Sequence, residues 1–401
     1  MFAPVEEQLR VLSRGIVDLV EEKELADKLA RSRREGRPLR VKLGIDPSSP
    51  DIHLGHSVVL RKLRDFQRLG HRAIVLWGTA TAMVGDPTGK NKTRPQLTRE
   101  QVEVNKRSYR DQVGRVLDVT AIEERENGEW FDRQSFIDCV KLAAGFTVAR
   151  ILERDSFAER FRAGEPISIH EMIYPLMQGY DSVELRADVE LGGTDQLFNL
   201  HRGRDLQERA GQEKQVLITT PLLVGLDGKE KMSKSLGNHI GVTDAPAEMI
   251  GKVMSLPDEP MRDWFTLLTD LPLATVEATL AGHPRAAKLE LARCIAAAYW
   301  GEAAAAEAVA QFDRVFKDGG RPEQIEERLI DAQSLEDGGI QLAALLVAIG
   351  FCSSKSEARR LVEQGGVRVD DRKQTDPLLR LSSGRYLVNA GKRKWCHARV
   401  P

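Results

Sequence analysis

The spacing of apolar residues changes several times in the first part of the chain. Residues 5–33 keep the period of one amphipathic helix, which is predicted to end at Gly36. Residues 39–46 then alternate between apolar and polar positions, as a half-buried strand does. One face of that predicted strand carries Lys42, Gly44 and Asp46.

The following segments extend this start into a parallel sheet. Residues 58–69 have helical spacing, and residues 73–77 form a short buried strand. A strand, a helix and a strand of these lengths predict a βαβ unit, whose strands run parallel. More strands are predicted at 187–191 and 216–224, with helical segments before and between them, including 147–161 and 169–183. The first part of the chain is therefore predicted to be α/β, with a Rossmann-like parallel sheet.

The last part of the chain has a different pattern. Residues 247–328 are almost wholly helical in spacing and rich in alanine. Residues 329–339 are acidic and end in glycine, which is typical of a linker. Residues 350–371 predict a turn, a capped helix and a strand that begins at Val367. An α-helical block and a small α+β module are thus expected after the sheet.

Composition indicates a globular protein with more than one domain. The chain has 401 residues, of which 41% are hydrophobic and 30% charged. Charged residues occupy the place where a signal peptide needs an apolar stretch, and no apolar run approaches the length that spans a bilayer. The four cysteines lie far apart, without the paired spacing of a zinc site or a disulfide framework. We expect a reducing, cytoplasmic compartment.

Charge is distributed unevenly along the chain. Residues 341–401 carry a net charge of +7, although the net charge of the whole chain is only −1. A short basic module on an acidic body predicts that this end meets a polyanion. A basic surface that only contacts solvent is the alternative.

A pair of histidines lies where the first predicted strand turns into a helix. His53 and His56 flank Gly55, and Asp51 is predicted to cap the helix. Open α/β sheets bind ligands at this kind of place, and a helix N-terminus offers free amides to a phosphate. A zinc pair and a hydrogen-bonded core pair are the other interpretations, but no third ligand stands at a metallopeptidase-like spacing.

A basic loop lies about half-way along the chain. Residues 227–238, DGKEKMSKSLGN, place ammonium and hydroxyl donors between glycines, as a clamp for a polyphosphate would. An exposed basic turn is the alternative for such a run. HLGH near the start, KMSKS at this position and an α/β domain between them together resemble the signature pair of class I aminoacyl-tRNA synthetases.

A third set of residues suggests the amino acid. Tyr174, Gln178 and Asp181 fall at i, i+4 and i+7 of a predicted helix, so one face presents a phenol, an amide and a carboxylate. Three polar tips would be unusual in a core because each would need a partner. They resemble the amino-acid pocket of bacterial tyrosyl-tRNA synthetases, and GDPTGK (85–90) and GGTDQ (192–196) extend the resemblance over nearly the whole chain.

The resemblance implies a role for each matching residue. His53 and His56 would stabilise the α-phosphoryl transition state, and the cations around pyrophosphate would be Lys231, Lys234, Lys90 and Arg94. The ATP-binding residues would be Gly44, Asp46, Gly55, Gly193, Asp195, Met232, Ser233 and Lys234. The tyrosine-binding residues would be Lys42, Asp86, Tyr174, Gln178, Asp181 and Gln196. GDPTGK lacks the spacing of a P-loop, so that motif is rejected.

Lys42 departs from the pattern of many bacterial relatives, which have a tyrosine at this position. We predict that its ammonium contacts the substrate phenol or pairs with Asp181. A solvated strand lysine is the alternative.

The basic tail resembles the RNA-binding module shared with a ribosomal small-subunit protein. Its tRNA-binding residues would be Arg359, Arg360, Lys392, Arg393 and Lys394. The implied domains are a catalytic domain at 1–240 with a dimer-forming insertion, a helical domain for the anticodon arm at 241–330, and the RNA-binding domain at 340–401.

The activity implied by the resemblance has two steps. Tyrosine and ATP give tyrosyl-adenylate and pyrophosphate, and the tyrosyl group then passes to the terminal ribose of tRNA. Mg²⁺ should accompany ATP, with no tightly bound cofactor and no protein metal site. A homodimer is expected. The alternatives are a tryptophanyl-type enzyme, a nucleotidyltransferase of the HxGH type, and a non-catalytic RNA-binding paralogue.

Overall fold

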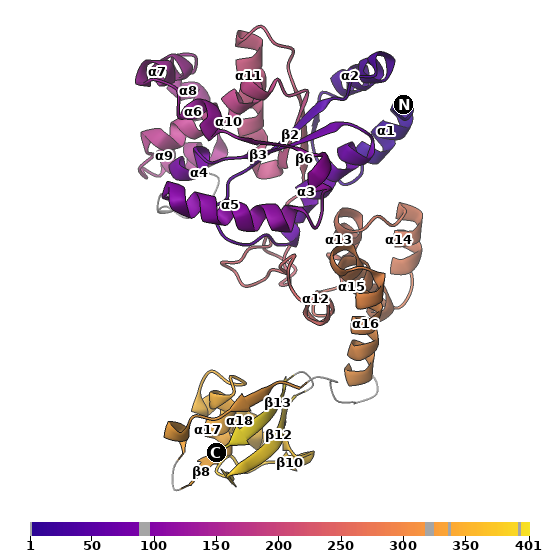
Figure 1. The fold of residues 1–401 in the computed structure, drawn as a ribbon, viewed down its shortest axis with the longest axis vertical. Helices are drawn as coiled ribbons and strands as arrows, with labels where there is room; N and C mark the ends of the chain where they lie inside the picture. The colour runs from indigo at the N-terminus through magenta and orange to yellow at the C-terminus, as the bar shows by residue number, and fades with distance from the viewer. Residues whose placement is uncertain (1, 88–96, 317–324, 336–337, 392–393) are drawn as a thin grey trace. The chain divides into compact units, whose positions relative to one another are not determined.

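The computed structural model describes the chain except residues 1, 88–96, 317–324, 336–337 and 392–393 (Figure 1). The described residues form two compact units, Met1–Ala305 and Ala306–Pro401. The predicted boundary at residue 240, between a catalytic and a helical domain, stays a prediction. No helix among the described residues is long and apolar enough to cross a membrane.

A six-stranded sheet forms the centre of the first unit, with the strand order β1-β6-β5-β2-β3-β4. Its strands are β1 (Leu19–Val20), β2 (Arg40–Ile45), β3 (Arg72–Trp77), β4 (Glu123–Glu126), β5 (Val189–Gly193) and β6 (Val216–Thr220). All neighbours pair in parallel except β1 and β6. The α/β prediction and the βαβ unit are therefore confirmed.

The chain leaves β2 in one direction along the sheet and later returns on its other side. From β2 it passes through α3 (Leu54–Arg68) to β3, and it comes back through α10 (Ile169–Leu185) to β5, which pairs with β2. Figure 1 shows α3 on one side of the sheet and α10 with α11 (Leu197–Arg209) on the other. The carboxyl ends of β2 and β5 thus flank a topological switch point, the usual ligand position in open α/β sheets.

The predicted single helix at 5–33 is wrong. The structure has α1 (Val5–Leu12) and α2 (Glu22–Glu35), with β1 between them. Gly15 adopts a left-handed conformation with φ 65°, and the Val17 amide donates to Thr219 of β6. Pairing with the sheet edge therefore replaces about two turns of helix, which the apolar period alone does not reveal.

Several short helices lie between β3 and α10, and a helical block follows the KMSKS segment. The first group is α4 (Thr81–Val84), α5 (Arg99–Val113), α6 (Gly128–Phe131), α7 (Phe136–Ala144), α8 (Val148–Ile151) and α9 (Asp155–Arg162). The block comprises α12 (Pro246–Val253), α13 (Met261–Leu268), α14 (Leu273–Leu280), α15 (Pro284–Trp300) and α16 (Glu302–Phe316). The predicted helical character of 247–328 is confirmed as far as the end of α16, but it is wrong at the end of the range, where Glu327–Leu329 forms a strand.

The second unit has a five-stranded sheet in the order β10-β9-β12-β13-β7 and its own apolar core. Its main elements are β7 (Glu327–Leu329), α17 (Leu342–Ala348), α18 (Lys355–Glu363), β9 (Val367–Val369), β10 (Arg372–Gln374), β12 (Gly384–Ala390) and β13 (Lys394–Val400). The predicted capped helix and following strand are α18 and β9, and Ser354 caps α18. The prediction that a linker begins at residue 329 is wrong, because Leu329 still belongs to β7 and pairs with β13.

Candidate active site

The histidine pair forms the first turn of α3. His53 is the N-cap and accepts from the Gly55 amide at 3.1 Å, while its own amide donates to Nδ1 of His56 at 3.3 Å. A Cβ on Gly55 would lie 2.9 Å from the His53 ring, so only glycine lets the imidazole fold over the backbone. Both Nδ1 atoms are used in this capping box, which does not favour the zinc interpretation.

Both imidazoles are neutral over the physiological range. Burial, with smaller contributions from neighbouring positive groups, lowers the pKa of His53 to about 2. Desolvation by the surrounding protein, together with the charges of Lys234 and Lys231, lowers the pKa of His56 to about 4. Neutral rings beside two lysines can donate hydrogen bonds to an anion without repelling the lysines.

The KMSKS loop lies beside this turn. Lys234 forms an ion pair with Asp51, with 2.7 Å between Nζ and Oδ2. The prediction that Asp51 caps α3 is therefore wrong. His53 is the N-cap, and the carboxylate of Asp51 is bound by the loop. Met232 is buried with its Cβ close to Gly55, and the Ser233 amide donates to Asn238 at 2.8 Å. The two signature motifs thus meet in one place.

The predicted polar face of α10 lies beside the carboxyl end of β2. The Tyr174 hydroxyl donates to Asp46 at 2.8 Å, and Asp46 also accepts from Thr81 at 2.7 Å. Burial, followed by the charge of Asp46, raises the pKa of Tyr174 well above its ordinary value, so the phenol stays protonated. Tyr174 therefore acts as a donor to Asp46 at the pocket.

Asp181 is buried and held by two donors that no sequence motif indicated. Trp130 donates its indole N–H at 3.0 Å, and Asn127 donates its side-chain amide at 3.3 Å. Burial raises the pKa of Asp181 to about 7, against the lowering effects of Lys42, Asn127 and Trp130. A carboxylate held in this way retains lone pairs for one more donor.

Lys42 is fully buried and does not pair directly with Asp181. Its Nζ lies 2.9 Å from Oε1 of Glu190, and it donates to the Gln178 carbonyl at 3.0 Å and the Ser182 hydroxyl at 2.8 Å. These three contacts use all three N–H donors of the ammonium. The predicted pairing with Asp181 is therefore wrong, and so is the solvated alternative; the predicted contact with a substrate phenol would need one of these bonds to break.

The remaining predicted pocket residues form a chain of hydrogen bonds. Gln196 donates to Asp86 at 3.0 Å and accepts from Asn199 at 2.9 Å, and Asn199 also donates to Gln178 at 3.1 Å. Arg154 is buried with NH2 4.0 Å from Asp86. The structure thus joins Asp86, Gln178 and Gln196, which lie far apart in sequence.

Asn127, Trp130, Arg154, Glu190 and Asn199 are the residues that sequence reasoning missed. Glu190 is marked only as a charged residue inside a strand otherwise made of apolar residues and glycines. The others stand in segments without a distinctive spacing.

The glycine-rich end of β5 and the strand glycine of β2 complete the predicted nucleotide side. Gly193 allows the chain to turn tightly, since a Cβ there would lie 2.6 Å from Asp195. Burial raises the pKa of Asp195, and Lys231 opposes this effect. Gly44 is exposed at the sheet end. Lys90 and Arg94 lie outside the described residues, and the described part of the chain contains no group of three or more His, Cys, Asp and Glu that could hold a metal.

Comparison with known proteins decides the family. The model of "tRNA synthetases class I (W and Y)" matches residues 34–317, and the S4 domain model matches residues 342–385. Tyrosine--tRNA ligase of Symbiobacterium thermophilum is 52% identical over 98% of both chains, and that of Bordetella pertussis is 49% identical over 99% of this chain and 97% of its own. The chain belongs to the tyrosine–tRNA ligases of class I.

Solved structures agree with this family. The tyrosyl-tRNA synthetase of Archaeoglobus fulgidus, complexed with L-tyrosine, matches with a TM-score of 0.61 and 27% identity over 76% of this chain and 100% of its own. A truncated mitochondrial tyrosyl-tRNA synthetase of Aspergillus nidulans, at 21% identity and TM-score 0.63, shares the fold over 78% of this chain and 94% of its own. The ligase therefore has a class I catalytic fold followed by an S4 RNA-binding domain.

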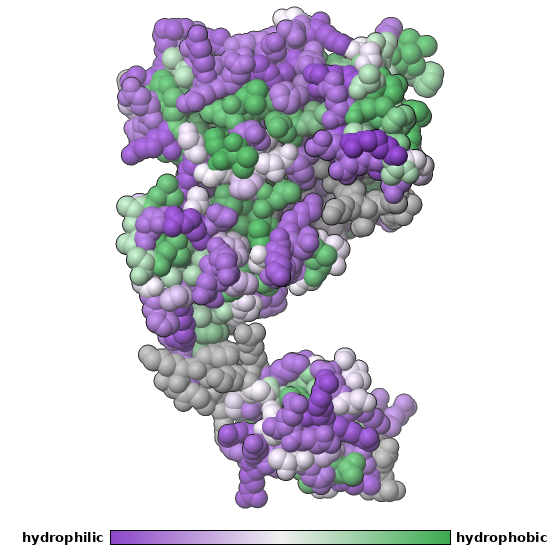
Figure 2. All heavy atoms as spheres, turned by 180° about the vertical axis from the view of Figure 1, so that it is seen from behind, coloured by the Kyte–Doolittle hydropathy of each residue, from purple (hydrophilic) through white to green (hydrophobic). Residues whose placement is uncertain are grey.

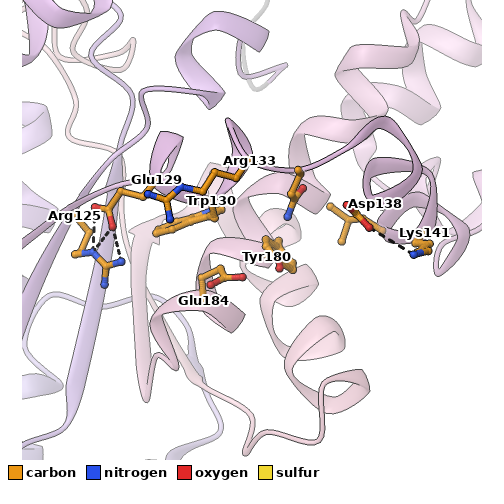
Figure 3. Close-up of a pocket in the computed structure, with 10 residues that line it drawn as sticks. Arg125, Glu129, Trp130, Arg133, Asp138, Lys141, Tyr180 and Glu184 are labelled. Atoms are coloured by element: carbon orange, nitrogen blue, oxygen red, sulfur yellow. Dashed lines mark hydrogen bonds and ion pairs between the residues drawn. The ribbon is translucent and has the colours of Figure 1, made fainter.

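Trp130, which donates to Asp181, also lines a cavity of the ligase. The cavity has a volume of about 660 Å³, and Figure 3 shows Trp130 and Tyr180 between charged side chains. Arg125 pairs with Glu129 at 2.6 Å and lies 5.7 Å from the Trp130 ring centre. The cavity wall thus supports the residue that holds Asp181.

Basic residues of the S4 domain lie on its surface. Arg359 and Arg360 are exposed on α18, while the Lys394 ammonium donates to the Phe351 carbonyl. Lys392 and Arg393 lie outside the described residues. Among the predicted tRNA-binding residues that the structure describes, the two arginines of α18 are therefore the ones that remain open to a polyanion.

Proposed function

We propose that the ligase activates tyrosine by charge stabilisation alone, without a protein nucleophile. The observation that supports this most is the neutral His53–His56 pair at the N-terminus of α3, beside Lys234 of the KMSKS loop. Tyrosine carboxylate would attack the α-phosphorus of ATP, and pyrophosphate would leave. Positioning and electrostatic stabilisation suit this reaction, which needs no proton transfer at the attacking carboxylate.

The proposed catalytic groups divide between the two ends of the triphosphate. His53 and His56 would donate to the α-phosphoryl oxygens as these gain charge, and the positive end of the α3 dipole would add to this. Lys231 and Lys234 would neutralise the departing pyrophosphate, with Lys90 and Arg94 as a further cationic arm. Lys234 must exchange Asp51 for phosphate during this step. Gly44, Gly193 and Asp195 would border the nucleotide.

The proposed tyrosine pocket reads both ends of the amino acid. Asp181 would accept from the substrate phenol, while Tyr174, Gln178 and Asp86 would surround the ammonium group. Gln196, which is held by its bond to Asp86, would orient the carboxylate of the substrate tyrosine. Phenylalanine would leave the buried Asp181 without its last donor, and tyrosyl-tRNA synthetases are a known example of rejection by this mechanism.

Mg²⁺ would enter with ATP and help to neutralise its phosphates. Imidazoles and ammonium groups gather at the proposed phosphate position, and they do not ligate Mg²⁺ as a carboxylate cage would. Phosphate oxygens and water would therefore hold the ion. The chain's own groups would bind and orient the triphosphate.

A homodimer and a cytoplasmic location belong to the same proposal. Large apolar side chains are exposed on α7, α8, α9 and the start of α10, namely Phe136, Ile137, Val140, Val148, Phe161 and Ile169. Apolar surface is also visible on one edge of the first unit in Figure 2. A second copy of the chain would cover this surface.

The helical block would contact the anticodon arm of tRNA, and the S4 domain would bind its phosphates.

Exchange of labelled pyrophosphate into ATP, with each of the twenty amino acids tested separately, is the experiment that tests the proposal. We expect exchange with tyrosine alone, because only its phenol satisfies Asp181. Exchange with tryptophan instead would favour the tryptophanyl-type alternative. No exchange with any amino acid, in protein that still binds tRNA, would support a non-catalytic RNA-binding paralogue.

A further inference from the structure

A buried ion pair lies behind the proposed tyrosine pocket. Lys42 of β2 and Glu190 of β5 are direct neighbours across the sheet, and their side chains are 0% and 1% exposed. Removing two charges from water costs several kcal/mol per ion, and replacing such a pair with apolar residues is often neutral or stabilising. Stability alone therefore does not explain why the pair is present.

Lys42 binds one turn of α10. Its ammonium donates to the carbonyl of Gln178 and the hydroxyl of Ser182, at 3.0 and 2.8 Å. Asp181 lies inside this turn and carries its carboxylate to Trp130. A shift of Lys42 would therefore move the backbone that presents Asp181.

Glu190 determines how the amide of Gln178 is turned. A carboxylate can only accept, so the Gln178 group that lies 3.4 Å from Oε1 of Glu190 must be the donor Nε2. The amide oxygen of Gln178 then points to Asn199, whose amide donates to it at 3.1 Å. That oxygen is also the atom that would accept from the substrate ammonium.

We propose that the Lys42–Glu190 ion pair is a positioning device for amino-acid recognition, in which Lys42 fixes the turn that carries Asp181 and Glu190 fixes the amide of Gln178. Neither side chain touches the substrate in this arrangement. The inference rests on the proposed tyrosine-binding roles of Gln178 and Asp181.

The double variant Lys42→Met/Glu190→Leu tests the inference. Apolar residues of similar size keep the core filled, so the protein is expected to fold. The loss of both contacts to α10 is expected to raise the KM for tyrosine about tenfold, which corresponds to about 1.4 kcal/mol of binding. The KM for ATP should change by less than about twofold, since the histidine turn and the KMSKS loop are untouched. Pyrophosphate exchange measures both constants.

Two further variants separate positioning from simple damage. Glu190→Gln keeps an acceptor oxygen for Lys42 and Gln178. The Gln215 amide now donates its Nε2 to Glu190; when this amide turns over, its Oε1, a buried atom with no partner among the described residues, can accept from the new amide. The KM for tyrosine should stay within about threefold of wild type in this conservative variant. Ser182→Ala removes the hydroxyl shared by Lys42 and Glu190 and should raise this KM about threefold in a stable protein. It serves as the test if the double variant does not fold.

The pH profile gives a signal that lost packing would not produce. Lys42 lowers the pKa of Asp181, and Glu190 raises it by a smaller amount, so the loss of both charges has the sign of the Lys42 effect. In the double variant this pKa should rise, so the acid limb of kcat/KM for tyrosine should move to higher pH. A loss of affinity that is equal at every pH would contradict the charge part of the inference.

Lys28→Met is the matched control. Lys28 is another buried lysine, 2% exposed, and it donates to the carbonyls of Asp188 and Lys214, away from α10. It should lower stability without changing the KM for tyrosine. If wild type exchanges with tyrosine and the folded double variant or Ser182→Ala keeps its KM, the inference is overturned. If wild type shows no tyrosine-dependent exchange, the proposed function fails instead.

Discussion

Asp181 combines a buried carboxyl group with a pKa close to neutrality, so its proposed recognition of tyrosine should depend on pH. Burial raises the pKa to about 7, although Lys42, Asn127 and Trp130 oppose the effect. Only the ionised group accepts fully from the substrate phenol. We expect kcat/KM for tyrosine to rise as pH increases through about 7, and Asp181→Asn to lose this limb together with about 10–100-fold of kcat/KM.

The same residue affects stability with the opposite sign. A carboxyl group whose pKa is higher in the folded than in the unfolded protein contributes stability below its unfolded pKa of 3.8, and this contribution is lost as pH rises through about 7. Relative to wild type, Asp181→Asn should therefore gain about 1 kcal/mol or more of stability as pH rises from about 5 to about 9. Thermal unfolding of both proteins across this range measures the gain. A constant difference between them would contradict the raised pKa.

At the scale of single residues, the sequence predicts the chemical role of a side chain better than it predicts the residues that the side chain contacts. His53, His56, Tyr174, Gln178 and Asp181 stand at spacings that indicate their chemistry, and the structure brings them to one edge of the sheet. The partner of Lys42 depends on the register between β2 and β5, which no local pattern contains. Trp130 and Asn127 reach Asp181 from a segment without periodic signal, so their role appears only in the folded chain.

Among the secondary structure elements, α3 connects the histidine turn to the helical block. Three arginines of α3, Arg61, Arg64 and Arg68, pair with Asp270 in the loop after α13. Arg14 adds hydrogen bonds to carbonyls at the end of α13, including Leu271 at 2.6 Å and Thr269 at 3.1 Å. The helix that begins with the proposed catalytic pair is thus fixed at its other end by the block proposed to contact tRNA.

Asp270→Asn should weaken this connection. Asp270 is about half exposed, so each pair is worth no more than an exposed pair, and we expect a loss of about 1–2 kcal/mol for the three together. Burial raises its pKa, but Arg61, Arg68 and Arg64 hold the pKa down at about 2. A lowered pKa gives stability above the unfolded value, which is lost as pH falls towards 2.

Urea unfolding of the first unit at pH 7 and at low pH measures this effect. The difference between wild type and Asp270→Asn should shrink as pH falls from about 4 towards about 2. Asp258→Asn is the matched control, because Asp258 pairs with the single lysine Lys288 on the surface, at 2.6 Å. A loss as small as that of the control would show that the three arginines do not act together.

The boundaries of helices and strands were predictable where the apolar residues keep a regular period. The predictions failed where pairing with a distant strand determines the boundary. β2, α3 and β3 agree with the expected segments because strand, helix and turn signals follow one another closely. The break between α1 and α2 depends on β6, which lies about 200 residues away in the chain, and Leu329 joins β13 for a similar reason. Long-range pairing is the information that a local window lacks.

At the scale of the whole molecule, the two units should carry separable functions. The residues proposed for amino-acid activation lie in Met1–Ala305, whereas the exposed basic side chains of α18 belong to Ala306–Pro401. We expect Arg359→Ala/Arg360→Ala to weaken tRNA binding and to leave tyrosine-dependent pyrophosphate exchange unchanged. Loss of two phosphate contacts should also reduce the slope of log affinity against log salt by about 1.5–2.

The salt slope distinguishes a direct phosphate contact from a change in the shape of the S4 domain. Arg359→Lys/Arg360→Lys keeps both charges and should keep the slope, although affinity can fall where a guanidinium binds two phosphate oxygens. A structural disturbance of α18 would lower affinity for the alanine variant with an unaltered slope. Filter binding of tRNA at several salt concentrations, with exchange assayed on the same preparations, therefore shows whether these two arginines contact the RNA backbone.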